Sequence, residues 1–252
     1  MIKKEIIIQN LKIKYIQSNE FSPENTFVFL HGWKSESTHL STIFKDLDNY
    51  IALDFPGFGE SDNHEGVWGV SEYADFLKMF MKKLGIVAPI LVGHSFGGSI
   101  AIKYVSCGGK IKRLILISSA GIRNKTKTIR LYGSIARISG LFFCLPFLTA
   151  HKKRLRKVFH GLIGSEDYAE AGMFEEDFKK IINEDLRCDM EKVEVKTFLI
   201  WGEEDKATPI GLAYKMSRLI KKSRLYVIKN AGHFVFLENP TDFEVAFKKS
   251  LC

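Results

Sequence analysis

Short and nearly continuous runs of apolar residues recur along the chain, and most of them end in turn residues. Runs of this length without polar alternation are typical of strands that helices cover on both faces. Eight strands are predicted in this way: Glu5–Gln9, Leu11–Gln17, Thr26–Gly32, Tyr50–Gly57, Pro89–Val92, Arg113–Ser118, Thr197–Trp201 and Arg224–Ile228. The first two form an N-terminal pair, with Gln9 and Asn10 as the expected turn between them.

Between these runs, apolar residues recur at helical spacing. The stretch Ser71–Leu84 carries the clearest stripe, which predicts a helix with one buried face. Pro209 and Pro240 are each expected in a first helical turn, preceded by Thr208 and Asn239 as capping residues. The alternation of strands and helices predicts an α/β fold with a mostly parallel, doubly wound sheet. Three further helices are predicted over Ser95–Val105, Ile210–Ile220 and Pro240–Leu251.

The alternation stops between Gly121 and Val193, where we find no convincing strand. We therefore expect a helical cap over residues 122–192, inserted into a core formed by residues 1–121 and 193–252. The cap also carries the sharpest charge asymmetry of a chain whose net charge is +8. Residues 122–164 contain ten Lys and Arg and no acidic residue, whereas residues 165–191 are acid-rich. We interpret the basic and acidic stretches as two faces of a helical unit that pair with each other or contact solvent. The alternative is that the basic stretch attracts anionic substrates or membrane surfaces.

Several other classes of protein are disfavoured by features that the sequence lacks. The first residues contain no apolar core of a signal peptide, and the apolar stretch 131–150 is broken by Arg137 and Pro146. No nucleic-acid-binding motif accompanies the basic residues, and the four cysteines have no metal or disulfide spacing. We expect a cytoplasmic monomer or homodimer without metal, cofactor, nucleic-acid partner or stable membrane insertion. Weak contact of the basic segment with an anionic surface stays open.

The stretch Gly93–Gly98, with the sequence GHSFGG, surrounds one serine with glycines. It joins a predicted strand to a predicted helix, so the chain must turn sharply. Ser95 at the apex of this turn is expected at positive φ, and small neighbours let chain segments pass closely. Such a turn exposes the serine hydroxyl beside a helix N-terminus, as in a nucleophile elbow. Ser95 is therefore the predicted nucleophile.

A serine hydroxyl needs a general base, and a histidine base needs a carboxylate that fixes its tautomer. Among seven histidines, His233 is the predicted base because it follows the last predicted strand in a tight turn. His94, inside the elbow, is instead expected to pack against or bond to neighbouring loops. The loop after strand 197–201 offers Glu203, Glu204 and Asp205, and its position in the loop favours Asp205 as the acid.

Acyl transfer also needs donors for a developing oxyanion. The backbone N–H groups of Phe96, directly after the serine, and of Trp33, in the loop after strand 26–32, are predicted to supply them. The aromatic residues of the cap are predicted to line an apolar entrance to the site. The alternative is that they hold the cap to the core. The predicted substrate pocket comprises His31, Gly32, Trp33, Phe96, Phe142, Phe143, Phe147 and Phe234.

With these residues in place, the chain resembles the α/β-hydrolase superfamily, in particular its serine carboxylesterases and its meta-cleavage-product hydrolases with a helical cap. The resemblance covers nearly the whole chain and includes the Ser, Asp, His order of the triad. It implies an α/β-hydrolase fold with an eight-stranded sheet, in which Asp54–Ser61 is a structural loop. Five ordered motifs carry it: His31-Gly32, Asp54–Ser61, Gly93–Gly98, Trp201–Asp205 and Gly232-His233.

The resemblance favours a serine hydrolase that cleaves esters of small to medium apolar acyl or aryl groups through an acyl-enzyme. Ser95 argues against dehalogenases and epoxide hydrolases, which have aspartate at the elbow. Proline iminopeptidases are disfavoured because we find no acidic cluster that would bind a peptide N-terminus. Carbon–carbon bond hydrolases of meta-cleavage diketones stay an alternative, although Phe234 stands where they often have tryptophan. A ligand-binding protein with a slow or lost triad is the other alternative.

Overall fold

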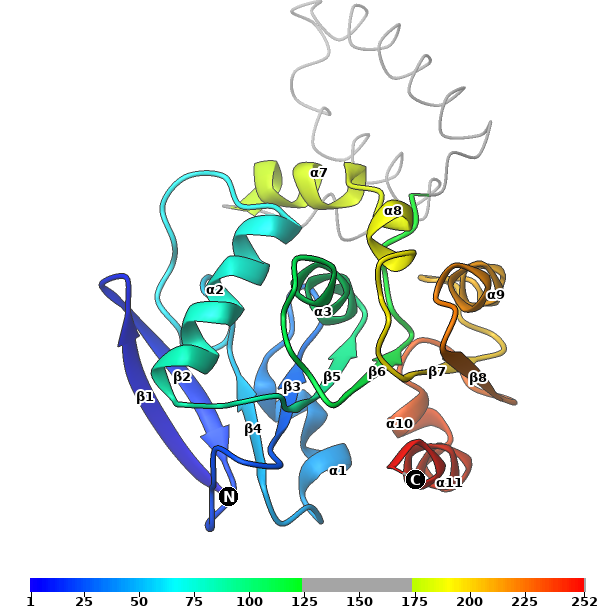
Figure 1. The fold of residues 1–252 in the computed structure, drawn as a ribbon, viewed down its shortest axis with the longest axis horizontal. Coiled ribbons are helices and arrows are strands. Elements are labelled where there is room, and N and C mark those ends of the chain that lie inside the picture. The colour runs from blue at the N-terminus through cyan, green and yellow to red at the C-terminus, as the bar shows by residue number, and fades with distance from the viewer. Residues whose placement is uncertain (124–173, 252) are drawn as a thin grey trace, which may run out of the picture. The chain divides into compact units, whose positions relative to one another are not determined.

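The computed structural model describes residues 1–123 and 174–251 (Figure 1). The chain forms two compact units, residues 1–122 together with 184–252, and residues 123–183. The predicted pocket residues Phe142, Phe143 and Phe147 lie outside the described residues, as does all of the basic segment 122–164 except Ile122 and Arg123.

One eight-stranded sheet runs through the first unit in the order β1-β2-β4-β3-β5-β6-β7-β8. β1 pairs antiparallel with β2, and β2 antiparallel with β4, whereas all other neighbours are parallel. The predicted mostly parallel α/β sheet is therefore confirmed. Gln9 and Asn10 make the predicted turn, both at positive φ. The strands are β1 (Ile2–Ile8), β2 (Leu11–Gln17), β3 (Phe27–Leu30), β4 (Tyr50–Leu53), β5 (Ile90–His94), β6 (Arg113–Ile117), β7 (Thr197–Gly202) and β8 (Ser223–Ile228).

Helices cover both faces of this sheet, which explains why its central strands are apolar along their whole length. Phe29, Val92 and Ile115 point into a core shared with α1 (Ser41–Phe44), α10 (Val235–Glu238) and α11 (Pro240–Leu251). Their neighbours along each strand point to the opposite face and are also buried. Figure 1 shows that face covered by α2 (Val70–Lys83), α3 (Phe96–Ser106) and α9 (Ile210–Leu219).

The four predicted helices are found to within one residue at either end, and the short elements η1 (Ser37–Leu40), α1, α8 (Arg187–Met190) and α10 were not predicted. Asn239 caps α11 as expected, with its side-chain oxygen accepting from the Asp242 N–H at 3.3 Å. The prediction for Pro209 was wrong, because this proline precedes α9 and Ile210 is the first helical residue. Thr208 does not cap α9 either, since its hydroxyl bonds to Asp205.

The division into units differs from the expected cap boundary at residue 192. Residues 184–192 belong to the first unit, because α8 packs against α3. The Asp189 carboxylate accepts a hydrogen bond from Ser106 at 2.8 Å and lies 3.2 Å from the Lys103 ammonium. The second unit contains α7 (Glu175–Asn183), which has an i,i+4 ion pair between Glu175 and Lys179. No helix among the described residues is long and apolar enough to cross a membrane.

Candidate active site

The turn from β5 into α3 contains a single residue, Ser95. Its φ of 52° and ψ of −115° confirm the positive φ predicted for it. The Ser95 N–H donates to the Ile117 carbonyl, and the Ala120 N–H donates to the Ser95 carbonyl, both at 3.0 Å. These bonds to the end of β6 and to the segment after it hold an unfavourable backbone conformation in place. Ser95 stays partly exposed within this otherwise buried turn.

Gly97 is needed in the elbow because the chain there lies very close to the end of β3. A Cβ atom there would lie 2.3 Å from the Leu30 carbonyl oxygen and 2.7 Å from that of His31. We expect Gly97→Ala to lower the free energy of unfolding by about 1–3 kcal/mol, because the end of β3 must move. Urea denaturation measures this. Gly211→Ala is the control, since a Cβ there meets open space; equal stability of the two variants would contradict the packing argument.

The loops after β7 and β8 bring Asp205 and His233 together. The Asp205 carboxylate lies 2.9 Å from His233 Nδ1 and accepts two hydrogen bonds from Thr208, from its N–H and its hydroxyl, each at 2.8 Å. Burial alone would raise the pKa of Asp205, but the bonds from His233 and Thr208 hold it below its ordinary value. An ionised Asp205 keeps the ring proton on Nδ1, which leaves Nε2 of His233 free to accept a proton.

His94 links the elbow to the histidine loop. Its Nε2 lies 3.1 Å from the His233 carbonyl oxygen, to which it donates, and the two rings are 4.9 Å apart. This confirms the expectation that His94 bonds to a neighbouring loop. A Cβ on Gly32 would lie 3.3 Å from His94 Nδ1 and 3.4 Å from Ser95 Cβ. The His233 loop and the Gly32 loop therefore both lie against residues 94 and 95.

Aromatic side chains surround this point. The Trp33 ring stands edge-on to Phe96 at 5.5 Å and to Phe58 at 4.9 Å. Phe234 is 43% exposed and lies 5.4 Å from the His233 ring. Of the residues predicted for the pocket, Trp33 and Phe96 thus contact each other, and Phe234 lies beside His233.

A family model described as the Alpha/beta hydrolase family matches residues 27–246 of this chain. The chain belongs to that family. The sheet order and the β5–Ser95–α3 elbow of this α/β hydrolase follow the fold that the sequence motifs implied.

Individual relatives share about a quarter of their residues with this α/β hydrolase. The AB hydrolase superfamily protein YisY of Bacillus subtilis is 28% identical, over 84% of this chain and 85% of that protein. The 2-hydroxy-6-oxo-2,4-heptadienoate hydrolase of Pseudomonas putida is 22% identical, over 87% and 86%. Among solved structures, an esterase from Exiguobacterium antarcticum aligns with a TM-score of 0.71 and 23% identity, covering 96% of each chain.

His31, which was predicted to line the substrate pocket, directly follows β3. Its ring is fully buried in the hydrolase core. The Phe55 N–H donates to His31 Nε2 at 3.1 Å, and His31 Nδ1 donates to the Gly32 carbonyl at 2.8 Å. Burial lowers the pKa of His31, which keeps the ring neutral for these two bonds. His31 therefore shapes the loop that carries Gly32 and Trp33.

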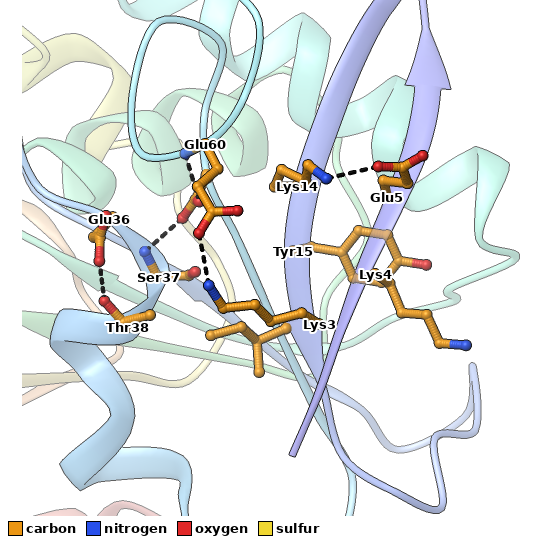
Figure 2. A pocket seen from close by; sticks show the side chains of 11 residues that line it. Lys3, Lys4, Glu5, Lys14, Tyr15, Glu36, Ser37, Thr38 and Glu60 are labelled. Atoms are coloured by element: carbon orange, nitrogen blue, oxygen red, sulfur yellow. Dashed lines mark hydrogen bonds and ion pairs between the residues drawn. The ribbon is translucent and has the colours of Figure 1, made fainter.

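The segment 54–61 is the structural loop that the motif implied. The buried Asp54 carboxylate accepts from the Ser37 N–H at 2.6 Å and from the Glu60 N–H at 3.2 Å. Ser37 and Glu60 line a cavity of about 390 Å³. Lys3 pairs with Glu60 at 2.6 Å. Figure 2 shows the side chains that line this cavity. Ion pairs occupy its rim, and none of the predicted site residues lines it. The cavity-lining residues are Lys3, Lys4, Glu5, Lys14, Tyr15, Ile16, Glu36, Ser37, Thr38, Asp54 and Glu60.

Sequence reasoning missed two residues that support the Asp205–His233 pair. Thr208 bonds to the acid, and its hydroxyl lies 3.4 Å from His233 Nδ1. Glu238 accepts hydrogen bonds from the backbone on both sides of His233. The spacing of Asp205 and Thr208 fits a local side-chain-to-backbone turn, a signal that was available in the sequence.

Within the described part of the chain, no three His, Cys, Asp or Glu side chains are grouped to hold a metal ion.

The burial of His94 predicts a pH-dependent stability. Burial, reinforced by the neighbouring His233, lowers the pKa of His94 from 6.5 to about 3. Below pH 6.5 the unfolded chain therefore gains a proton at His94 that the folded chain does not take up until about pH 3. This group alone removes up to about 1.4 kcal/mol of stability per pH unit in that range.

We expect His94→Gln to flatten the pH dependence of urea unfolding between about pH 7 and about pH 5. Glutamine retains a donor for the His233 carbonyl but does not titrate. Parallel curves for the wild type and the variant would contradict the prediction.

Proposed function

We propose that this α/β hydrolase is a serine hydrolase that cleaves carboxylic esters with small to medium apolar acyl or aryl groups. The observation that carries the proposal is a histidine whose Nδ1 is held by a buried carboxylate. Its loop accepts a hydrogen bond from His94, the residue directly before a partly exposed serine at a strained elbow. The carboxylate is anchored by Thr208, so the pair is pre-organised before substrate binds.

In the proposed reaction, His233 Nε2 takes the proton of the Ser95 hydroxyl as its oxygen attacks the ester carbonyl carbon. Asp205 stabilises the imidazolium that forms. The N–H groups of Phe96 and Trp33 stabilise the oxyanion, each worth roughly 3 kcal/mol of barrier. His233 then protonates the leaving alcohol, and an acyl-enzyme forms on Ser95. Water, activated by His233, attacks that acyl group and releases the acid.

The substrate preference follows from the apolar surroundings that we propose for the acyl group. Phe234 offers an exposed ring beside His233. Phe142, Phe143 and Phe147 are proposed to add apolar surface from the cap. The ten basic residues of 122–164 would then favour esters with an anionic leaving group. The similarity to an esterase of known structure supports the fold needed for this reaction.

Carbon–carbon bond hydrolysis of a meta-cleavage diketone is the second candidate. The relative from Pseudomonas putida, which aligns with 87% of this chain, is named as a hydrolase of such a substrate. The two candidates share Ser95 and His233 and differ in the bond that is cleaved. Phe234 next to His233 is the sequence feature that favours the ester.

The test is hydrolysis of p-nitrophenyl esters from acetate to decanoate, with a 2-hydroxy-6-oxo-dienoate as a parallel substrate. Turnover of the esters with a clear optimum in chain length is the expected result. Turnover of the dienoate alone would replace the ester proposal with the second candidate. No turnover of either substrate, together with no labelling by a fluorophosphonate, would overturn both.

A further inference from the structure

One carboxylate holds the backbone on both sides of His233. Glu238 Oε2 accepts the Gly232 N–H at 2.7 Å, and Glu238 Oε1 accepts the Phe234 N–H at 2.9 Å. Both oxygens are therefore used, and the two peptide groups that they bind flank the candidate catalytic histidine. A Cβ on residue 232 would lie 3.0 Å from Glu238 Oε2, so glycine admits this close approach.

Glu238 acts from a fixed support. It is the last residue of α10, whose Val235 and Phe236 are buried in the core that α1, α10 and α11 share with the sheet. The N–H groups of Leu237 and Glu238 donate to the Phe234 carbonyl at 2.8 and 3.0 Å. The carboxylate thus reaches back to the start of its own short helix and ties that helix to the histidine loop.

The same loop is also held by the elbow. His94 donates to the His233 carbonyl, while Asp205 accepts from the His233 ring. With Glu238, these contacts fix the peptide groups of residues 232–234 and one ring nitrogen. The remaining ring nitrogen, Nε2, is the one that must face Ser95 in every step of the proposed reaction.

We propose that Glu238 is a positioning residue that sets the direction of the His233 ring, a role that rests on the proposed hydrolase function. Charge-assisted bonds from a carboxylate to backbone N–H groups are stronger than neutral ones, so these two bonds restrict the backbone on both sides of His233. A displacement of a catalytic group by about 1 Å can cost about 100-fold in rate. Glu238 acts through His233 and does not touch the reacting atoms.

The test compares Glu238→Ala, Glu238→Gln and the control Glu244→Ala, which removes a glutamate from the exposed side of α11. The concentration of active sites is determined by titration to completion with a fluorophosphonate, and kcat is calculated per active site. Unfolded enzyme therefore does not enter the comparison. We expect kcat per site to fall about 10- to 100-fold in Glu238→Ala, with KM within about twofold. Glu238→Gln, which keeps one acceptor oxygen, is expected to fall in between. Glu244→Ala should match the wild type.

A second readout does not depend on turnover. The proton shared by His233 Nδ1 and Asp205 is expected to give a low-field proton NMR resonance, lost or broadened in Glu238→Ala and retained in Glu244→Ala. Unchanged kcat per site and an unchanged resonance would overturn the role of Glu238. If the wild type neither turns over esters nor reacts with the fluorophosphonate, the proposed function fails. The resonance then still decides whether Glu238 positions His233.

Discussion

Ser95→Ala is expected to lower kcat for ester hydrolysis by roughly 10⁴-fold or more. The variant removes the hydroxyl that forms the acyl-enzyme, and no general base can replace a missing nucleophile. The elbow should still fold, because its geometry is held by backbone bonds to Ile117 and Ala120 that do not involve the side chain. Initial rates with the best p-nitrophenyl ester, and far-UV circular dichroism to verify folding, measure the effect.

Ser99→Ala is the matched control for that experiment. Ser99 lies one turn further along α3, where it is buried, and it is not part of the proposed triad. We expect this variant to keep kcat within a few-fold of the wild type, since it alters only packing inside the helix. Full activity in Ser95→Ala would rule out Ser95 as the nucleophile. An equal loss in both variants would point to damage of α3 instead.

Asp205→Asn is expected to reduce kcat by about 10⁴-fold. The shape of the side chain is preserved, and Thr208 can still donate to its oxygen. The amide NH₂ group, however, would donate to His233 Nδ1, which would move the ring proton to Nε2. His233 would then present a proton to Ser95 where the reaction needs an acceptor, and the imidazolium would lose its stabilising charge.

The same loop offers a control that removes one negative charge and keeps the length of the side chain, as Asp205→Asn does. Glu204→Gln removes one negative charge one residue earlier, from an exposed side chain. Its kcat is expected to stay near the wild-type value, because its charge is screened by solvent. If Asp205→Asn kept kcat within tenfold, or if Glu204→Gln lost as much, Asp205 would not be the acid that orients His233.

The central strands were predictable because burial on both faces leaves a simple pattern. Their residues alternate between two apolar layers, so almost every position is apolar. β1 was predicted to begin at Glu5, whereas it begins at Ile2. This edge strand is exposed at most positions, so burial leaves little trace in its first residues. The position of α8 in the first unit was missed because it depends on contacts of Asp189 with α3.

The candidate site was predictable where chemistry fixes the residue type. A strained strand-to-helix turn needs glycines, and the order of Ser95, Asp205 and His233 follows the order of the strands that carry them. Thr208 and Glu238 were missed because their roles come from hydrogen bonds to backbone atoms, which many sequences can make. The bonds of the buried His31 ring to the Phe55 and Gly32 backbone were not predicted for a similar reason, since no motif reveals them.

Labelling with a fluorophosphonate, followed by mass spectrometry of the peptides, tests the triad most directly because it requires no knowledge of the natural substrate. The reagent reacts with a serine only when a nearby base activates it. We predict one adduct, located on Ser95, and labelling that is strongly slowed in His233→Ala. An adduct on a different residue, no adduct at all, or equal labelling rates in the wild type and His233→Ala would contradict the account of this protein as a serine hydrolase.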